Sequence, residues 1–212
     1  MSETTLPPPA GTMPRLPADV ETLRIAYAAL AELWCSPRDA ESPDLVATAR
    51  AASEAVRRLD PDAAALLVRF LETPIDEDAY VELFELDPRC ALYLGSHTFE
   101  EPRSCAKAGV SDRNGYMGEL LGIYGHFGLS PNGRELPDYL PLLLEFLAFA
   151  VEKDDPIREK LLAEYILPYL PPVRNRLAEL DTPYVLLMDA LERILKLDLS
   201  LAKESIEEVA GA

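Results

Sequence analysis

Histidine and cysteine, which often serve as metal ligands, nucleophiles and general bases, are scarce in this sequence of 212 residues. It holds two histidines and three cysteines, namely His97, His126, Cys35, Cys90 and Cys105. His126 follows Glu119 by seven residues, so a helix would place both on one face, two turns apart. Helical metal sites use ligands four residues apart or a Glu-x-x-His pair, so this spacing disfavours a metal centre.

The cysteines indicate neither a zinc site nor a disulfide framework, because their number is odd and no two form a Cys-x-x-Cys pair. Cys90 and Cys105 are compatible with a redox pair, although free cysteines are most often small buried hydrophobes. The sequence also lacks a Gly-x-Ser-x-Gly elbow and a glycine-rich phosphate loop. We therefore expect no catalytic residues, metal or cofactor. The alternative is a helical metal or redox enzyme that uses the histidines, Glu119 and the cysteines.

The formal charge of −17 indicates which kinds of molecule the protein surface attracts and which it repels. Such a surface repels nucleic acid and attracts a basic peptide or protein patch, although surplus carboxylates also serve solubility. The first residues lack the basic and apolar regions of a secretory signal. The longest apolar run lies within residues 134–151 and is shorter than the roughly 20 residues that a membrane-spanning helix needs. These features predict a cytoplasmic protein without membrane insertion.

The elements that must position these side chains are predicted to be helices, because the apolar residues along the sequence are spaced with helical periodicity. Apolar residues recur every three or four positions, and several segments begin with an aspartate followed by proline, as helices do. The pattern predicts helices near 19–34, 42–59, 60–72, 76–86, 116–127, 134–151, 155–180 and 181–199. The fold class is therefore all-α, a single compact helical-bundle domain of about seven or eight helices.

The domain is expected to span residues 19–199, after a disordered lead-in over 1–18 and before a frayed acidic tail over 200–212. Residues 87–112 predict a long connection that contains a helical turn, and connections of this length are usually functional or mobile. Pro168, Pro171 and Pro172 lack backbone donors, so they should bend the helix in which they lie.

The segment RELPDYLPLLLEFLAFAV, residues 134–151, carries the strongest pattern. Asp138 is placed to accept the free N–H groups of a helix N-terminus, and Pro141 falls in the first turn, where proline is tolerated. The helix that follows is apolar most of the way round, which is typical of the centre of a bundle. Part of the apolar arc would alternatively line a groove for a partner helix, with the nearby acids facing a basic group.

Three motifs occur in a fixed order: YVELFEL at 80–86, RCALYL at 89–94 and ELPDYLPLLLEFLA at 135–148. They resemble the TorD/DmsD/NarJ superfamily of molybdoenzyme maturation chaperones, and most of all its nitrate reductase delta subunit (NarJ-type) branch, over roughly residues 20–197. The resemblance implies an all-helical protein without catalytic activity. It further implies a system-specific chaperone that binds the N-terminal segment of a molybdopterin-enzyme catalytic subunit and assists cofactor insertion before export or membrane attachment.

The resemblance and the acidic, apolar pattern together predict a peptide-binding site. Its residues are Tyr80, Leu83, Phe84, Glu135, Pro137, Asp138, Tyr139, Leu140, Leu143 and Glu145. Many relatives have histidine where this chain has Tyr139, and tyrosine does not titrate near neutral pH, so a nucleotide-binding or pH-sensitive role does not carry over. A permanent structural subunit of a redox complex is the second alternative. The sequence specifies neither the client enzyme nor the oligomeric state.

Overall fold

The computed structural model describes residues 18–38, 44–73, 77–99, 111–153 and 155–210, with side chains as far as residue 202. The lead-in over 1–17, Cys105 and residues 100–110 of the long connection lie outside these residues. The α-helices are α1 (Ala18–Trp34), α2 (Leu45–Val56), α3 (Pro61–Leu71), α4 (Glu77–Phe84), α6 (Asp112–His126), α7 (Leu140–Ala150), α8 (Pro156–Lys160), α9 (Leu170–Glu179) and α10 (Tyr184–Ala210). Within the described residues the only β-type pairing is an isolated bridge between Tyr93 and Tyr139, which confirms the all-α fold.

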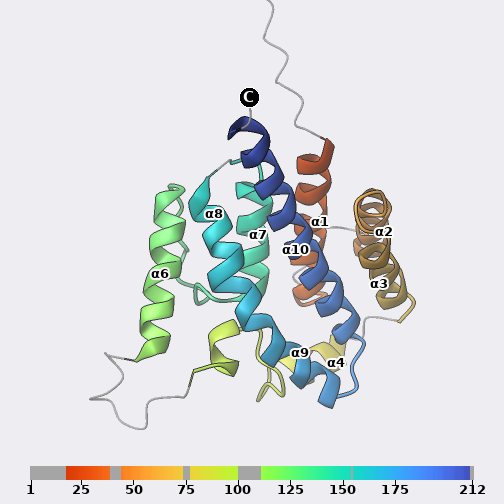
Figure 1. Cartoon of the computed structure of the whole chain (residues 1–212). Coiled ribbons are helices and arrows are strands. Elements are labelled where there is room, and N and C mark those ends of the chain that lie inside the picture. The colour runs from red at the N-terminus through yellow and green to blue at the C-terminus, as the bar shows by residue number, and fades with distance from the viewer. Residues whose placement is uncertain (1–17, 39–43, 74–76, 100–110, 154, 211–212) are drawn as a thin grey trace, which may run out of the picture.

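The helices form one bundle around α1, α7 and α10 (Figure 1). α1 packs against α7 and α2, while α3 packs against α2 and α10. α2 and α3 cover one side of the bundle, α6 lies on the opposite side, and α4 and α9 lie together at one end (Figure 1). α10 continues to Ala210, so it extends through most of the segment assigned above to a frayed tail.

α7 lies at the centre of the bundle, as its nearly continuous apolar sequence predicts. Leu140, Leu143, Leu144 and Leu147 have no exposed surface. Burying one leucine side chain stabilises a fold by about 1.5–3 kcal/mol, so these four contribute on the order of 6–12 kcal/mol before entropy is subtracted. Pro141 lies in the first turn, where its missing N–H has no helical partner to lose.

Aspartates begin two helices as expected. Asp60 Oδ1 accepts hydrogen bonds from the N–H groups of Asp62 and Ala63 at 3.0 and 2.9 Å, at the start of α3. Asp155 Oδ1 accepts from the Ile157 N–H at 2.8 Å, at the start of α8. In both cases the carboxylate satisfies donors that have no partner within the helix.

The helical segment that contains Pro168, Pro171 and Pro172 bends at the prolines but is not interrupted by them. α8 passes directly into a π-helical segment, η2 (Leu161–Ile166), then a 3₁₀ turn, η3 (Leu167–Tyr169), and then α9. Pro168 lies in the 3₁₀ turn and Pro171 in the first turn of α9. The π-helical and 3₁₀ segments around Pro168 replace the regular α-helical hydrogen bonds that a proline breaks, and Pro171 lies in a first turn, where a missing N–H is tolerated, so the chain continues past both.

A buried polar network joins three helices. Arg158 of α8 and Asp198 of α10 form an ion pair, and the same carboxylate oxygen accepts the Tyr27 hydroxyl of α1 at 2.6 Å. Arg158 is 4% exposed, Asp198 2% and Tyr27 not at all. A buried carboxylate is tolerated only when a cation or hydrogen bonds satisfy it, so this network fixes the relative positions of the helices.

Candidate functional site

A groove of about 930 Å³ lies beside α4 and α7. It runs between α4, the residues after α1, the segment 88–93, the linker 129–135 and the outer face of α7. Of the ten residues predicted for the site, the groove brings together Tyr80, Phe84, Glu135, Tyr139 and Glu145. Motifs more than 50 residues apart in the sequence therefore meet on one surface.

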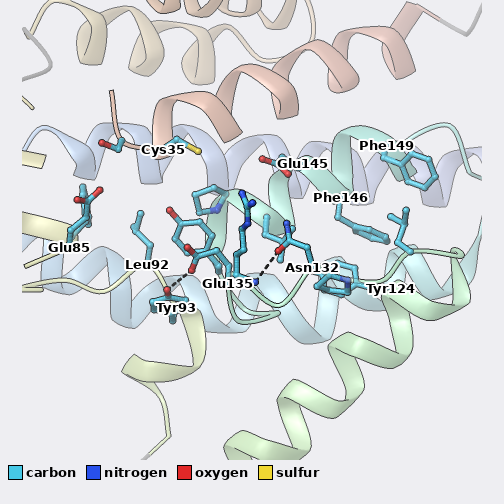
Figure 2. Close-up of a pocket in the computed structure, with 18 of the residues that line it drawn as sticks. Cys35, Glu85, Leu92, Tyr93, Tyr124, Asn132, Glu135, Glu145, Phe146 and Phe149 are labelled. Carbon is cyan, nitrogen blue, oxygen red and sulfur yellow. Dashed lines mark hydrogen bonds between the residues drawn. The ribbon is translucent and has the colours of Figure 1, made fainter. Parts of the chain in front are cut away.

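The charge on the groove is predominantly negative. Glu85, Glu135 and Glu145 line it together with a single described base, Arg134. All three acids are exposed, so a partner can reach their carboxylates. Figure 2 shows that they come from different segments and are spread along the groove rather than clustered.

Tyrosines form the floor between these acids. The Tyr93 hydroxyl donates to Glu135 Oε2 at 2.5 Å, and its ring lies 5.3 Å from that of Tyr139, centroid to centroid. Burial and the neighbouring Glu135 carboxylate raise the pKa of Tyr93 to about 12, so it remains a neutral donor. Tyr80 is almost fully buried and donates to the Trp34 carbonyl at 2.8 Å. These bonds hold the floor in one arrangement before any ligand arrives.

One end of the groove is apolar. Phe146, Phe149 and Tyr124 lie there, and Glu85 and Leu92 lie at the opposite end (Figure 2). The rings of Tyr124 and Phe146 are edge to face at 5.0 Å, whereas Phe149 is 47% exposed. Exposed aromatic rings beside a cavity mark binding surfaces more often than isolated exposed leucines do. The groove thus combines an acidic stretch with an apolar end.

Asp138 does not cap α7, contrary to the expectation from sequence. The helix begins at Leu140, and Asp138 Oδ2 instead accepts the Gly95 N–H at 2.9 Å. The Asp138 carbonyl accepts the Leu94 N–H at 3.1 Å, and the Leu140 N–H donates to the Leu92 carbonyl at 2.9 Å. A donor 43 residues away has therefore replaced the local N–H groups.

Asp138 has no exposed surface, so its carboxylate is not part of the groove surface. Burial raises the pKa of this carboxyl, while the Gly95 hydrogen bond and the charge of Arg113 act against that rise. Its described role is to anchor the segment 92–97 against the start of α7. Leu92 and Tyr93 belong to this segment and line the groove, so Asp138 fixes the position of groove residues without contacting the groove itself.

The other predicted residues also lie behind the groove. Leu140 and Leu143 are core residues, and the Pro137 carbonyl accepts the Tyr124 hydroxyl at 2.8 Å. Leu83 lines a different, smaller cavity beside Phe70 and Tyr184. These side chains support the lining residues and do not contact the space itself.

The residues considered for metal or redox chemistry are dispersed. His126 Nε2 lies 2.7 Å from Asp155 Oδ2, and Glu119 accepts the Tyr165 hydroxyl at 3.3 Å. Burial raises the pKa of the Cys90 thiol to about 11, which disfavours the reactive thiolate. In the described part of the chain, no three His, Cys, Asp or Glu side chains are grouped as metal ligands would be.

Several lining residues were not predicted. Glu85 directly follows the matched Phe84, Tyr93 lies within the quoted RCALYL motif, and Phe146 and Phe149 lie on the apolar arc of α7. Their side-chain types gave no separate signal, because glutamates and aromatic residues of this kind are common on helices. Cys35 and Leu129 also line the groove, and no sequence pattern marks them.

Comparison with known proteins places this arrangement in a family. The model of the family described as "Nitrate reductase delta subunit" matches residues 63–188, which is more than half of the chain. The chain belongs to the nitrate reductase delta subunit family. This confirms the NarJ-type branch predicted from the three motifs, and the matched region contains α4, the segment 88–97 and α7, which form most of the groove.

Two relatives within this family come from Escherichia coli strain K12. The chain is 35% identical over 147 residues to the nitrate reductase molybdenum cofactor assembly chaperone NarJ, covering 68% of the chain and 57% of that protein. It is 36% identical over 138 residues to the probable nitrate reductase molybdenum cofactor assembly chaperone NarW, covering 64% and 54% respectively. The alignments thus span little more than half the length of these delta subunit relatives. Among the described residues, no helix has both the length and the apolarity to cross a membrane.

Proposed function

We propose that this protein is a system-specific maturation chaperone. In this proposal it binds the N-terminal segment of a molybdopterin-enzyme catalytic subunit in the cytoplasm and assists cofactor insertion and assembly, without making or breaking covalent bonds itself. The family membership and the names of the relatives support the general role. The single observation that carries the binding step is the groove with three exposed acids and an apolar aromatic end.

The groove suits a segment that is both basic and apolar. Carboxylates at Glu135 and Glu145 attract a basic side chain, and arginine in particular pairs with carboxylates through two parallel hydrogen bonds. The tyrosine faces beside Glu135 add a surface on which a cation can lie. Phe146 and Phe149 then take the apolar face of a short helix, as grooves that bind amphipathic helices do.

The direct test is calorimetric titration with a synthetic peptide. The peptide is the N-terminal segment of a nitrate reductase molybdopterin subunit, because the relatives are named as nitrate reductase chaperones. We expect binding with a Kd in the micromolar range or below, weakening as salt is raised, because rim charges act through screened attraction. Absence of binding, together with normal cofactor loading in a deletion strain, would overturn the proposal.

Variants separate the apolar and the acidic contributions to binding. Phe149→Ala removes a large anchor and is expected to weaken binding about tenfold. Glu145→Gln keeps the shape and removes one charge, so it should weaken binding by about two- to fivefold and reduce the salt dependence. Glu72→Gln, at the exposed C-terminal end of α3 and away from the groove, is the matched control and should bind as the wild type does. Equal effects of the two glutamate variants would contradict the assignment of the site.

A further inference from the structure

A second hollow, of about 430 Å³, lies on the other side of the segment 88–97 from the groove. Its polar lining comes from two places: the segment itself supplies Arg89, Ser96 and His97, and α9 supplies Asn175, Arg176 and Glu179. α9 packs against the turn Leu94–His97, at the end of the bundle that also carries α4 (Figure 1). In a chain of charge −17, two arginines against a single glutamate on one hollow form a local exception.

Backbone carbonyls of the segment 88–97 hold the Arg176 and His97 side chains in place. Arg176 Nε donates to the Arg89 carbonyl at 2.8 Å, and His97 Nε2 contacts the Ala91 carbonyl at 2.7 Å. Both carbonyls belong to the same short segment, so one stretch of backbone sets the positions of a guanidinium and an imidazole. A ligand that pairs with them therefore meets groups that are already ordered, which lowers the entropic cost of binding.

The described ion pairs leave donors for a ligand. Arg176 Nη1 lies 3.1 Å from Glu179 and Arg89 Nη1 lies 3.4 Å from Glu82, and all four side chains are substantially exposed. A guanidinium carries five N–H donors, of which the described contacts of Arg176 use two. Exposed pairs of this kind are worth at most about 1 kcal/mol, so a doubly charged anion can displace or bridge them.

We propose that this hollow binds a small molecule through a phosphate group. The planar guanidinium of arginine matches the geometry of phosphate oxygens, and two arginines with the Asn175 amide supply the donors that phosphate sites use. The volume exceeds that of a single phosphate group, and Pro88, Ala91 and Pro172 give the remaining space an apolar lining. The non-phosphate part of the ligand lies against these three residues. This proposal is independent of the peptide groove, since its charged residues are different ones.

The test uses phenyl phosphate as the probe, with phenol and inorganic phosphate as comparison ligands. In an NMR titration of the wild-type protein, phenyl phosphate is expected to shift amide signals of residues 89–97 and 173–176 with a Kd of about 1 mM or tighter. Inorganic phosphate should shift the same signals with weaker affinity, and phenol should not. No shift in these residues at about 10 mM phenyl phosphate, or shifts elsewhere only, would overturn the proposal.

Variants check the two guanidinium groups. Arg176→Ala and Arg89→Gln are each expected to weaken phenyl phosphate binding at least tenfold. Arg176→Lys should retain an intermediate affinity, because lysine keeps the charge and loses the fork. Arg57→Ala removes an exposed arginine that pairs with Glu54 on α2, away from the hollow, and should leave the affinity unchanged. Circular dichroism confirms that each variant is folded. Equal affinity of Arg89→Gln, Arg176→Ala and the wild type would overturn the assignment.

Discussion

Replacing Gly95 by alanine tests whether the segment 92–97 is held as tightly as its hydrogen bonds indicate. A Cβ at this position would lie 3.0 Å from Asp138 Oδ2, 3.3 Å from a ring carbon of Tyr116 and 3.4 Å from one of Phe99. Asp138 cannot withdraw without lengthening its 2.9 Å hydrogen bond from the Gly95 N–H, and it is fully buried. Overpacking of this kind costs about 1–3 kcal/mol.

Gly118→Ala on α6 is the matched control, and it should have the opposite sign. A Cβ at Gly118 meets nothing within 4 Å, and the residue lies in the middle of a regular helix. Alanine in place of glycine in a helix interior stabilises by about 0.5–1 kcal/mol. The two glycine-to-alanine variants should therefore differ by roughly 1.5–4 kcal/mol in unfolding free energy.

Urea unfolding followed by circular dichroism measures both variants, and thermal unfolding gives a second reading. For a chain of this size, each kcal/mol corresponds to about 2–4 °C in Tm. The double variant Gly95→Ala with Asp138→Ala should recover part of the loss from overpacking, since the closest contact is gone. If Gly95→Ala proved as stable as the wild type, Asp138 would not clamp this segment, and the account of how the groove is positioned would be refuted.

Three further predictions concern buried and capping groups. Arg158→Leu leaves the Asp198 carboxylate buried without its cation and should cost about 3–5 kcal/mol in urea unfolding; a loss below 1 kcal/mol would contradict this. Burial raises the pKa of Asp138 above its ordinary value near 3.8, so the folded protein holds this proton more tightly than the unfolded chain. The unfolding free energy should therefore fall as pH rises from about 4 through the raised pKa, and this part of the fall should be missing in Asp138→Asn. Asp155→Ala removes the acceptor for the Ile157 N–H and the partner of His126, and should cost about 0.5–2 kcal/mol; unchanged stability would show that the cap is dispensable.

Most of the fold follows from local patterns in the sequence. The structure confirms three such predictions: the cap at Asp60, the central position of α7 and the bend near Pro168. Each depends on residues that lie within one or two helical turns of each other. Periodicity shows which side of a helix is apolar, and in a single domain of this length that apolar side packs against the core. These features needed no knowledge of distant contacts.

The site was predictable only in part, because it depends on long-range pairing. Asp138 and Gly95 are 43 residues apart and Tyr93 and Glu135 are 42 apart, so no local pattern reveals either hydrogen bond. A carboxylate ahead of an apolar helix has the signature of a cap, yet tertiary structure gave it another donor. The motif at 135–148 identified the right region but did not separate lining residues from those that support them.

The segment 88–97 separates two cavities. Leu92 and Tyr93 face the groove, whereas Ala91, Ser96 and His97 face the hollow, and Pro88 borders both. One stretch of backbone thus lines both cavities, so a ligand that displaces this stretch in one cavity also displaces lining residues of the other. Thermodynamic linkage then requires reciprocity: the factor by which occupancy of one cavity changes affinity at the other is the same in both directions.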